Sequence, residues 1–473
     1  MVELKRRLGF WQAYATATGL VVAGSTMVSL GNSFGTVGPA FIVAAFIAMV
    51  VSIIIALSYA ELSSIMPGPG MIGDYTLVSM GRFMSIITLL GGYLVLGATV
   101  GPMETMTASM AVEYLVPGVN TVLVAVLILG IFLIINVLGV EFFGSVQLGI
   151  VLLLMLSTAG MGILGLFDVF TLSASTIPDF NPAGWSTVMQ AVALGLWLFI
   201  GIEFVIPLGN EVKKPEKTIP KAMIFGLLTI FVVDMLFGFA LTRHIDLGIL
   251  STAGTPQIEG ASAMFGKVGG IFMASITVLA ATSSINANFA AVPRMFYGLA
   301  RKGLLPKVFA YIHPKTRTPV FGIFFVFLLF TVPLFVLETN ITIITTLLSA
   351  ASVTWLFSYI IAQVDVLILR KRYPNIERPF KVPLSPILPI IGIIACVYMI
   401  IAITPNWSQK LAIYGISGSM MLAICLYAFF WLKYKNLPMF KPLTIEELKQ
   451  ENSVVEEESL EFLPAIEPVR SGE

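Results

Sequence analysis

Long apolar runs recur along the whole chain and leave few folds open to it. One of them, residues 121–136, reads TVLVAVLILGIFLIIN and carries no charged side chain. About 20 mostly apolar residues allow a helix to cross the hydrocarbon core of a bilayer. Only 11% of the 473 residues are charged, whereas soluble domains carry about a quarter. The sequence therefore predicts an all-α polytopic membrane protein rather than a β-barrel, whose short alternating segments do not dominate here.

Hydropathy delimits about twelve expected transmembrane helices, and the basic residues orient them. The expected spans are residues 11–30, 38–66, 82–114, 119–138, 142–166, 185–209, 219–242, 266–300, 318–337, 341–369, 384–404 and 409–433. Of the 27 lysines and arginines, Arg294 lies within a span, and only Arg243, Lys267 and Lys410 fall on the side opposite to the others. Because basic loops stay in the cytoplasm, we expect both termini to be cytoplasmic.

Two of the expected spans contain helix breakers at mid-length. The first contains the sequence GST at residues 24–26, and the sixth reads LFIGIEFVIP, with Gly201, Glu203 and Pro207 in an apolar run. Glycine weakens a helix, and proline removes a backbone donor. In hydrocarbon, unpaired backbone groups persist only where they line a cavity or are satisfied by other groups. Close packing of helices through small residues is the alternative explanation for one such span.

The positions of the two interruptions favour a cavity. The first and sixth spans each begin a set of five, and because five is an odd number the second set is inverted relative to the first. Paired interruptions in inverted halves are typical of a transport site near the middle of the membrane. The N-terminal end of a half-helix offers free N–H groups and a partial positive charge to an anion. Gly24, Ser25 and Thr26 are expected to form such an end.

An ordered set of motifs resembles the amino acid–polyamine–organocation (APC) family of secondary transporters. Residues 59–70 read YAELSSIMPGPG, and residues 199–222 contain FIGIE and then NEVKKPEKTIPKA. Residues 283–306 read SSINANFAAVPRMFYGLARKGLLP, and HPKTRTPV at 313–320 continues that pattern. The chain is similar to the family over roughly residues 10–370.

The resemblance implies a LeuT-type fold, in which two inverted five-span repeats are followed by two extra spans. It also implies transport of an amino acid or a related amine across the cell membrane by alternating access. The implied divisions are a cytoplasmic N-terminus (1–10), a transport core (11–369, with repeats 11–166 and 185–369), two additional helices (370–434) and an acidic cytoplasmic tail (435–473).

The resemblance further assigns functional residues. The unwound part of the first span would receive a substrate carboxylate, and that of the sixth would line the amine end. These residues are Ala23, Gly24, Ser25 and Thr26 in the first span and Phe199, Gly201, Ile202 and Glu203 in the sixth. Glu203 would hold the ammonium group or accept a proton. Two gating roles are expected on grounds other than the resemblance. Phe199 is the candidate lid in alternating access, and the position of Arg294, about two turns inside Arg301, makes it a tie at the cytoplasmic gate or an anchor for neighbouring carbonyls.

The fifth and eighth spans leave the coupling ion open between H⁺ and Na⁺. Proton-coupled relatives often place a lysine in the fifth span, about where Leu154 stands here. The eighth span offers Thr282 and Ser283, similar to the hydroxyl pair that ligates sodium in sodium-coupled proteins of this fold. With the carbonyl of Val22 or Ala23 they would supply the oxygen ligands that a hard cation prefers. The alternative is that both hydroxyls bond back to their own helix.

Glu104, in the third span, is a second departure from the family pattern. A charge at mid-span costs on the order of 3 kcal/mol on insertion scales unless it is paired or hydrated. If Glu104 lies across the pathway from Glu203, a diamine, a basic amino acid or an amino alcohol is favoured as substrate. Alternatively, Glu104 is a protonated structural residue near the external vestibule.

The leading hypothesis is a secondary active transporter of amino acids or related amines, coupled to H⁺ or Na⁺. The alternatives are an exchanger without net ion coupling and a polyamine or amino-alcohol permease. The expected partners are the small-molecule substrate and the lipid bilayer, without a cofactor other than the co-transported ion. No nucleotide is expected because the sequence has no GxxxxGK[ST] motif, and neither a nucleic acid nor an enzymatic activity is expected.

Overall fold

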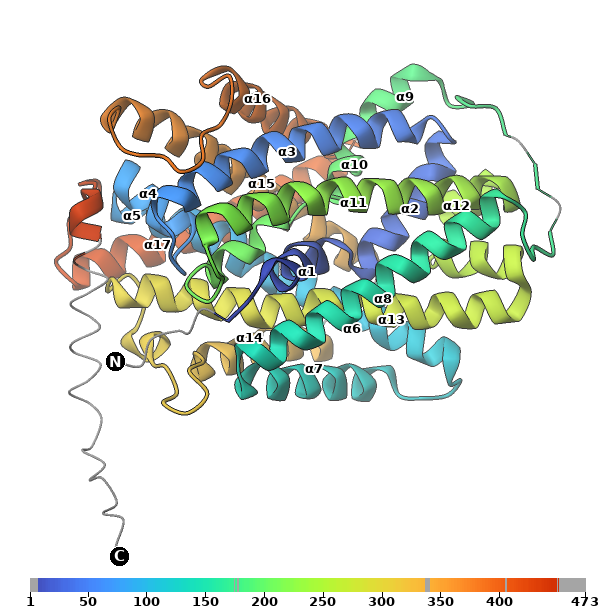
Figure 1. Ribbon diagram of the computed structural model, residues 1–473, viewed down its shortest axis with the longest axis horizontal. Helices are drawn as coiled ribbons and strands as arrows, with labels where there is room; N and C mark the ends of the chain where they lie inside the picture. Colours follow the sequence, from blue (N-terminus) through green and yellow to red (C-terminus); the bar gives the residue numbers. More distant parts are fainter. Residues whose placement is uncertain are drawn as a thin grey trace, which may run out of the picture.

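The computed structural model describes residues 7–448 and 450, apart from residues 174, 177, 337–340 and 405. Within these residues the chain is all-helical, and its only strand-like pairing is an isolated parallel bridge between Leu8 and Val212. Most of the long helices run side by side along the long axis of the molecule (Figure 1). The N-terminal residues 1–6 and most of the predicted tail, residues 451–473, lie outside the described part.

The first half of the chain opens with a broken span. Its two parts, α1 (Phe10–Val21) and α2 (Gly24–Val37), are bent by 57° relative to each other. The following elements are α3 (Phe41–Ile65), α4 (Ile72–Ser79), the continuous series α5 (Arg82–Leu89), η1 (Leu90–Leu94) and α6 (Val95–Leu115), then α7 (Thr121–Leu138) and α8 (Val140–Leu166).

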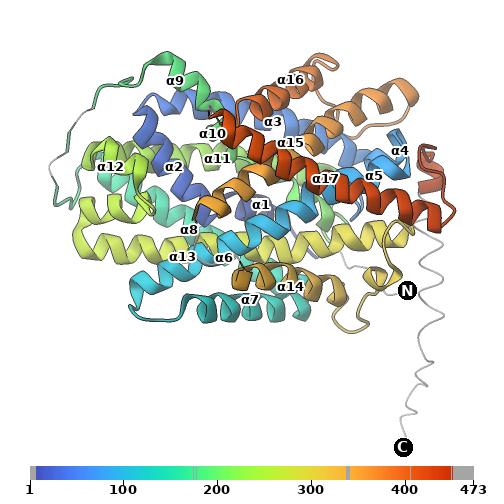
Figure 2. The same cartoon turned by 180° about the vertical axis from the view of Figure 1, so that it is seen from behind.

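The second half also opens with an interrupted span, formed by α9 (Gly184–Gln190), α10 (Val192–Trp197) and the 3₁₀-helix η2 (Ile202–Leu208). It continues with α11 (Pro215–His244), α12 (Leu247–Thr252), α13 (Pro256–Arg301), η3 (Lys307–Ala310), α14 (Val320–Val336) and α15 (Ile341–Arg372). Two helices, α16 (Ile387–Ile401) and α17 (Trp407–Tyr434), complete the described bundle. Figure 2 shows α17 lying across α15, against which it packs.

The predicted fold class is confirmed, because the described residues contain 9 helices long and apolar enough to cross a membrane, and the bent pair α1–α2 makes up to 10. The remaining apolar helices, α14 and α16, are shorter, so the count of about twelve spans stays a prediction. The eighth expected span began at residue 266, and α13 has non-helical geometry at Phe265 and Gly266. Gly266 has a φ of 64°, a left-handed conformation that glycine adopts without strain.

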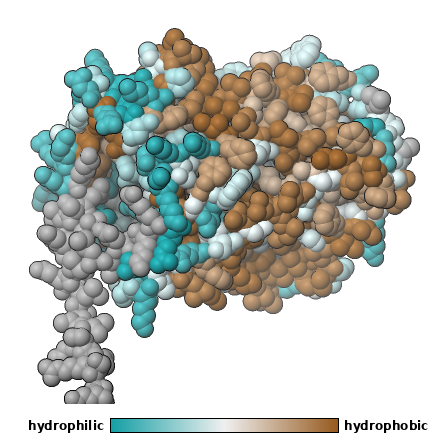
Figure 3. Space-filling model, viewed as in Figure 1, coloured by the Kyte–Doolittle hydropathy of each residue, from teal (hydrophilic) through white to brown (hydrophobic). Residues whose placement is uncertain are grey.

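The helix α7 illustrates how the bilayer acts as solvent for this chain. The Asn120 side chain caps α7 by accepting a hydrogen bond from Leu123 N, and Gly139, with a φ of 129°, separates it from α8. One stripe of α7 is more than half exposed, and it consists of Leu123, Leu127, Ile131, Ile134 and Leu138. Such a stripe faces lipid, and Figure 3 shows hydrophobic residues across the broad middle of the molecule with hydrophilic residues gathered towards its ends.

Ion pairs join the loops at one end of the bundle, which we call the basic end and define by residues 66–81, 209–214, 302–319 and 373–386. The Lys302 ammonium lies 2.8 Å from the Asp74 carboxylate, and both side chains are buried. Arg372 Nη1 donates to Val78 O over 2.6 Å. Trp431 Nε1, near the end of α17, donates to Gly303 O over 2.9 Å. These contacts connect helices of both halves.

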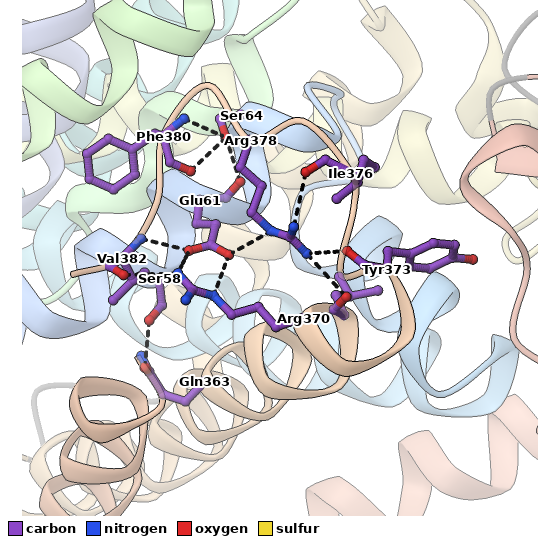
Figure 4. Close-up of polar contacts among 11 residues, drawn as sticks. Ser58, Glu61, Ser64, Gln363, Arg370, Tyr373, Ile376, Arg378, Phe380 and Val382 are labelled. Carbon is purple, nitrogen blue, oxygen red and sulfur yellow. Dashed lines mark hydrogen bonds and ion pairs between the residues drawn. The ribbon is translucent and has the colours of Figure 1, made fainter. Parts of the chain in front are cut away.

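Glu61 organises a polar cluster at the basic end (Figure 4). It lies near the end of α3 and accepts hydrogen bonds from Arg370 Nε at 2.9 Å and from Val382 N at 2.7 Å. Arg378 Nε lies 3.2 Å from Glu61 Oε1, the oxygen that also accepts from Arg370 Nε, and Arg378 Nη2 donates to Tyr373 O over 2.8 Å. Glu61 therefore pairs with Arg370 in the last turn of α15 and with Arg378 of the loop that follows. It fastens the loop after α15 onto α3.

The first part of the predicted tail packs on the bundle. Phe83 N donates to Met439 O over 2.9 Å, and Leu443 N donates to Leu77 O over 3.2 Å. Ile445 and Leu448 are buried. The tail therefore begins with a docked segment, residues 437–448, that lies on α4 and α5.

Candidate functional site

The start of α2 is occupied by a carboxylate from the third span. Gly24 N donates to Glu104 Oε2 over 2.8 Å, and Ser25 N donates to Glu104 Oε1 over 3.2 Å. Both N–H groups belong to the first turn of α2, where no backbone acceptor is available. The carboxylate also meets the positive end of the helix dipole. Glu104 is fully buried, so a carboxyl group of the protein itself lies where the sequence predicts a substrate carboxylate.

A small cavity lies between the two broken spans, next to Glu104. Its apolar walls come from α1, α6 and the sixth span, and they are Leu20, Val21, Leu96, Val100, Trp197 and Ile200. The other lining residues come mostly from α2, α13 and α15, and they are Ala23, Ser25, Thr26, Glu104, Ser284, Asn288 and Trp355. Ala23, Ser25, Thr26 and Glu104, four of the five expected binding residues of the first half, therefore lie at one cavity.

Glu203 lies in a cluster of aromatic hydroxyl and indole groups beyond this cavity. Its Oε1 accepts hydrogen bonds from Tyr93 O–H at 3.0 Å and Trp355 Nε1 at 3.1 Å. Its Oε2 accepts from Tyr359 O–H at 2.8 Å. Trp355 both lines the cavity and donates to Glu203, so it connects the two groups. The carboxylate joins the sixth span to η1 and α15.

The break in the sixth span depends on Gly201. Its φ of 103° is left-handed, which glycine adopts freely and other residues only with strain. Its N–H is satisfied by Tyr359, whose hydroxyl oxygen accepts it over 3.1 Å. The same hydroxyl donates to Glu203, so one tyrosine fills two roles at the interruption. Tyr93 belongs to the π-helical turn η1, a feature frequent at functional sites.

The other expected residues of the sixth span face neighbouring helices. Phe199 is buried, and its ring lies 6.5 Å from that of Phe231 on α11. Ile202 packs against Gly226, where an added Cβ would lie 2.9 Å from Ile202 Cδ1. In this conformation the cavity is lined from the sixth span by Trp197 and Ile200. The lid role of Phe199 stays a prediction.

A glutamine amide lies among the oxygen atoms between α1 and α13. Gln147 Nε2, from α8, lies within hydrogen-bond distance of Ser283 Oγ (3.0 Å), Ser283 O (3.2 Å) and Ala15 O (3.3 Å). Ser283 Oγ donates to Gly19 O over 2.9 Å. Gln147 Oε1 accepts from Asn286 Nδ2 over 2.7 Å. The amide therefore makes contacts with oxygen atoms of the kind that would coordinate a cation.

The remaining residues of the predicted ion site lie apart from this amide. Thr282 Oγ1 donates back to its own helix, to Val278 O over 2.8 Å. At the break of the first span, Val22 N donates to Thr18 O over 2.9 Å. Ala23 O accepts from Thr26 Oγ1 over 2.8 Å. Of the two expected hydroxyls, Ser283 is the one that faces α1.

Arg294, on α13, contacts a carboxylate at the basic end and a carbonyl of its own helix. Its Nε lies 2.6 Å from Glu211 Oε2, and its Nη1 donates to Ala290 O over 2.6 Å. Glu211 O in turn accepts from Leu8 N over 2.9 Å. The chain before α1 is thereby attached to the loop after η2, next to the buried ion pair.

Comparison with known proteins identifies the family. The amino acid permease family matches residues 8–430, which is most of the chain. The chain belongs to this family of amino acid permeases. The permease is 25% identical over 427 residues to a branched-chain amino acid permease of Bacillus subtilis, covering 84% of this chain and 88% of that protein. It is 25% identical over 430 residues to a serine/threonine exchanger of the same organism (88% and 95%).

A third relative of the permease is a methylthioribose transporter of Bacillus subtilis, 26% identical over 423 residues that cover 84% of this chain and 88% of that protein. The all-helical membrane fold, the multi-pass membrane location and the amino acid transport predicted from the sequence agree with this family.

Several residues of the permease site were not expected from the sequence. Trp197, Ser284 and Asn288 lie within the expected spans but carry no charge, and their spacing resembles that of ordinary packing residues. Gln147 lies seven positions before Leu154, the residue that stands about where proton-coupled relatives often have a lysine. The sequence does contain a sign of this role, because a glutamine within the apolar run of α8 needs buried hydrogen-bond partners.

Proposed function

We propose that this permease carries a small amine-bearing solute across the cell membrane by alternating access. The observation that supports this most directly is the cavity between the two broken spans, with Glu104 and Asn288 in its wall. Alternating access requires the pathway to be closed at one end at a time. The buried Arg294–Glu211 pair, which joins α13 to the loop after η2, is consistent with closure at the basic end. Opening that end would require this pair and the attached Leu8 segment to separate.

The named substrates of the relatives differ widely. They include branched-chain amino acids, serine and threonine, and methylthioribose. Family membership therefore supports small-molecule transport without defining the group that the site recognises. For this chain, the residues of the cavity wall carry that information.

Exchange without net ion coupling is favoured over H⁺ or Na⁺ coupling by Gln147. Its amide donates to the oxygen atoms that a sodium ion between α1 and α13 would need as ligands. An amide has no titratable proton in the physiological range, so it differs in this respect from the lysine of proton-coupled relatives. The serine/threonine exchanger among the relatives is consistent with this mode.

Counterflow in proteoliposomes tests the proposal. Purified permease would be reconstituted, loaded with an unlabelled panel of amino acids and amines, and supplied with a labelled compound that the panel identifies by competition. Uptake is expected to require an internal substrate and to be equal in sodium and choline buffers. Net uptake into empty vesicles that follows a Na⁺ or pH gradient would contradict exchange, and no uptake of any compound would contradict transport.

A further inference from the structure

We infer that the transported substrate is a monoamine cation without a carboxylate group, such as a simple alkylamine or an amino alcohol. This inference rests on the proposed transport function and narrows it to a substrate class. It follows from the charges of the cavity wall and from the hydrogen bonds that are already made there.

The cradle that would receive a carboxylate is already filled. Glu104 accepts the N–H groups of Gly24 at 2.8 Å and of Ser25 at 3.2 Å, at the start of the 14-residue helix α2. A substrate carboxylate would need these same donors and would meet a negative charge at the same place. Two carboxylates that share one site cannot both remain ionised without a large energetic cost. The chain thus supplies from α6 the anion that an amino acid would otherwise bring.

The charge of the cavity wall is one-sided. Glu104 is the only ionisable acid or base among the described lining residues, which include no lysine, arginine or histidine. A zwitterion would place its ammonium group favourably and leave its carboxylate without a cationic partner. A monovalent cation would neutralise the wall, so the two ligand classes are distinguished by charge alone.

A second acceptor belongs to a residue that lines the same cavity. Asn288 is 3% exposed and lines the cavity, and its Nδ2 donates to Ser284 O over 3.1 Å. This bond fixes the orientation of the amide, and its Oδ1 is buried without a hydrogen-bond partner. A buried carbonyl oxygen without a partner costs free energy that a donor on a ligand would recover. An ammonium group has three donors and no acceptor, and so it fits Asn288 Oδ1 and the Glu104 carboxylate.

The rest of the site favours one ammonium group over two. A diamine would need a second anionic group, and Glu203 is the acid that the sequence predicts on the other side of the pathway. Its two oxygens already accept hydrogen bonds from Tyr93, Trp355 and Tyr359. The remaining wall is apolar or aromatic and includes Trp197. A short apolar or hydroxylated body therefore suits the space beyond the ammonium group.

The test compares amino acids with the amines that their decarboxylation would give. Wild-type permease in nanodiscs would be titrated with serine and ethanolamine, leucine and 3-methylbutylamine, and valine and 2-methylpropylamine, with putrescine as the diamine. Tryptophan fluorescence reports binding because Trp197 and Trp355 line the cavity. We expect at least one monoamine to bind at least tenfold more tightly than its parent amino acid and than putrescine.

Variants then test the assigned group. Glu104→Ala is expected to weaken monoamine binding at least tenfold and to reduce or reverse the preference over the parent amino acid. Glu113→Ala, at an exposed acid further along α6, is the matched control and is expected to behave as the wild type. If Glu104→Ala does not fold, the preference of the wild type decides alone. A wild type that prefers an amino acid overturns this inference and leaves the proposed transport intact, whereas failure of every compound in both binding and counterflow contradicts both.

Discussion

Arg294 and Glu211 form a two-point ion pair, with 2.6 Å between Nε and Oε2 and 3.0 Å between Nη2 and Oε1. Both side chains are almost completely buried. The pair joins α13 to the loop that follows η2, and it lies beside the backbone contacts of Leu8 with Glu211 and Lys213. Its geometry makes each partner dependent on the other, because a single buried charge would be left without compensation.

The first prediction concerns this ion pair. Arg294→Ala is expected to destabilise the fold by about 3–5 kcal/mol because it leaves Glu211 charged and buried. The double variant Arg294→Met with Glu211→Leu is expected to recover most of that loss while weakening closure of the basic end. Thermal unfolding in detergent would measure the first effect. Equal stability of Arg294→Ala and wild type would show that Glu211 is not charged in the folded protein.

The second prediction concerns the acid in the sixth span. Glu203→Gln replaces an acceptor by an amide whose N–H groups would face the hydroxyl of Tyr359. We expect counterflow to be severely reduced, with a stability loss of about 1.5–3 kcal/mol for the altered charged hydrogen bonds. Tyr93→Phe, which removes one donor and leaves the acid in place, is the milder control. Near-normal counterflow by Glu203→Gln would remove this carboxylate from the transport cycle.

The third prediction concerns the neutral amide between α1 and α13. Gln147→Lys would place a titratable ammonium group near the carbonyl oxygens of Ala15 and Ser283. Between pH 6 and 8, the pH dependence of counterflow by this variant is expected to differ from that of the wild type, whereas Gln147→Met is expected to keep the wild-type profile. The measurement is counterflow at matched external and internal pH. A wild type that responds to pH or to Na⁺ as strongly as the lysine variant would contradict the role assigned to Gln147.

The fourth prediction concerns the docked segment of the tail. Thr444 N donates to Glu447 Oε2 over 2.7 Å, and Glu447 N donates to Thr444 Oγ1 over 3.1 Å, which together form a capping box. The hydrogen bond from the backbone of Thr444 lowers the pKa of the exposed Glu447 carboxyl below its ordinary value. A lowered pKa in the docked state stabilises docking above the ordinary pKa, and this contribution is lost as the pH falls through the lowered value.

Hydrogen exchange of residues 441–448 would measure this docking. Thr444→Ala is expected to destabilise the helical turn of residues 445–448 by about 1 kcal/mol and to speed exchange. Thr444→Ser keeps the cap and should resemble the wild type. In the wild type, exchange corrected for its intrinsic pH dependence is expected to increase at acidic pH. Protection that is unchanged in Thr444→Ala would show that the cap does not hold the segment.

Much of the fold could be predicted because a bilayer imposes simple rules on sequence. The apolar runs placed the helices, and the paired breaks near Gly24 and Gly201 were visible as glycine and hydroxyl residues at mid-span. The gathering of Ala23, Ser25 and Thr26 at the cavity followed from the same pattern. These features depend on local composition, which a single sequence contains.

The orientation of individual side chains around the site could not be predicted in the same way. Phe199 and Ile200 are adjacent, yet Phe199 packs on Phe231 and Ile200 lines the cavity. The direction of each depends on the left-handed turn at Gly201, whose φ of 103° is not implied by the residue type alone. Likewise, Glu104 meets Gly24 across 80 positions of the sequence. Such a contact depends on helix packing that no local pattern encodes.

The Glu61 cluster has a mechanical consequence for any conformational change. Arg370 in the last turn of α15, Arg378 of the segment that follows and the backbone of Val382 converge on one carboxylate of α3. Helix α3 is thereby joined to α15 and to the segment after it, at the same end where Arg294 contacts Glu211. The Glu61 cluster has several partners and is expected to stay intact, whereas the Arg294–Glu211 contact is a single ion pair that can separate. Movement at this end is therefore expected to pivot about Glu61 when the Arg294–Glu211 pair separates.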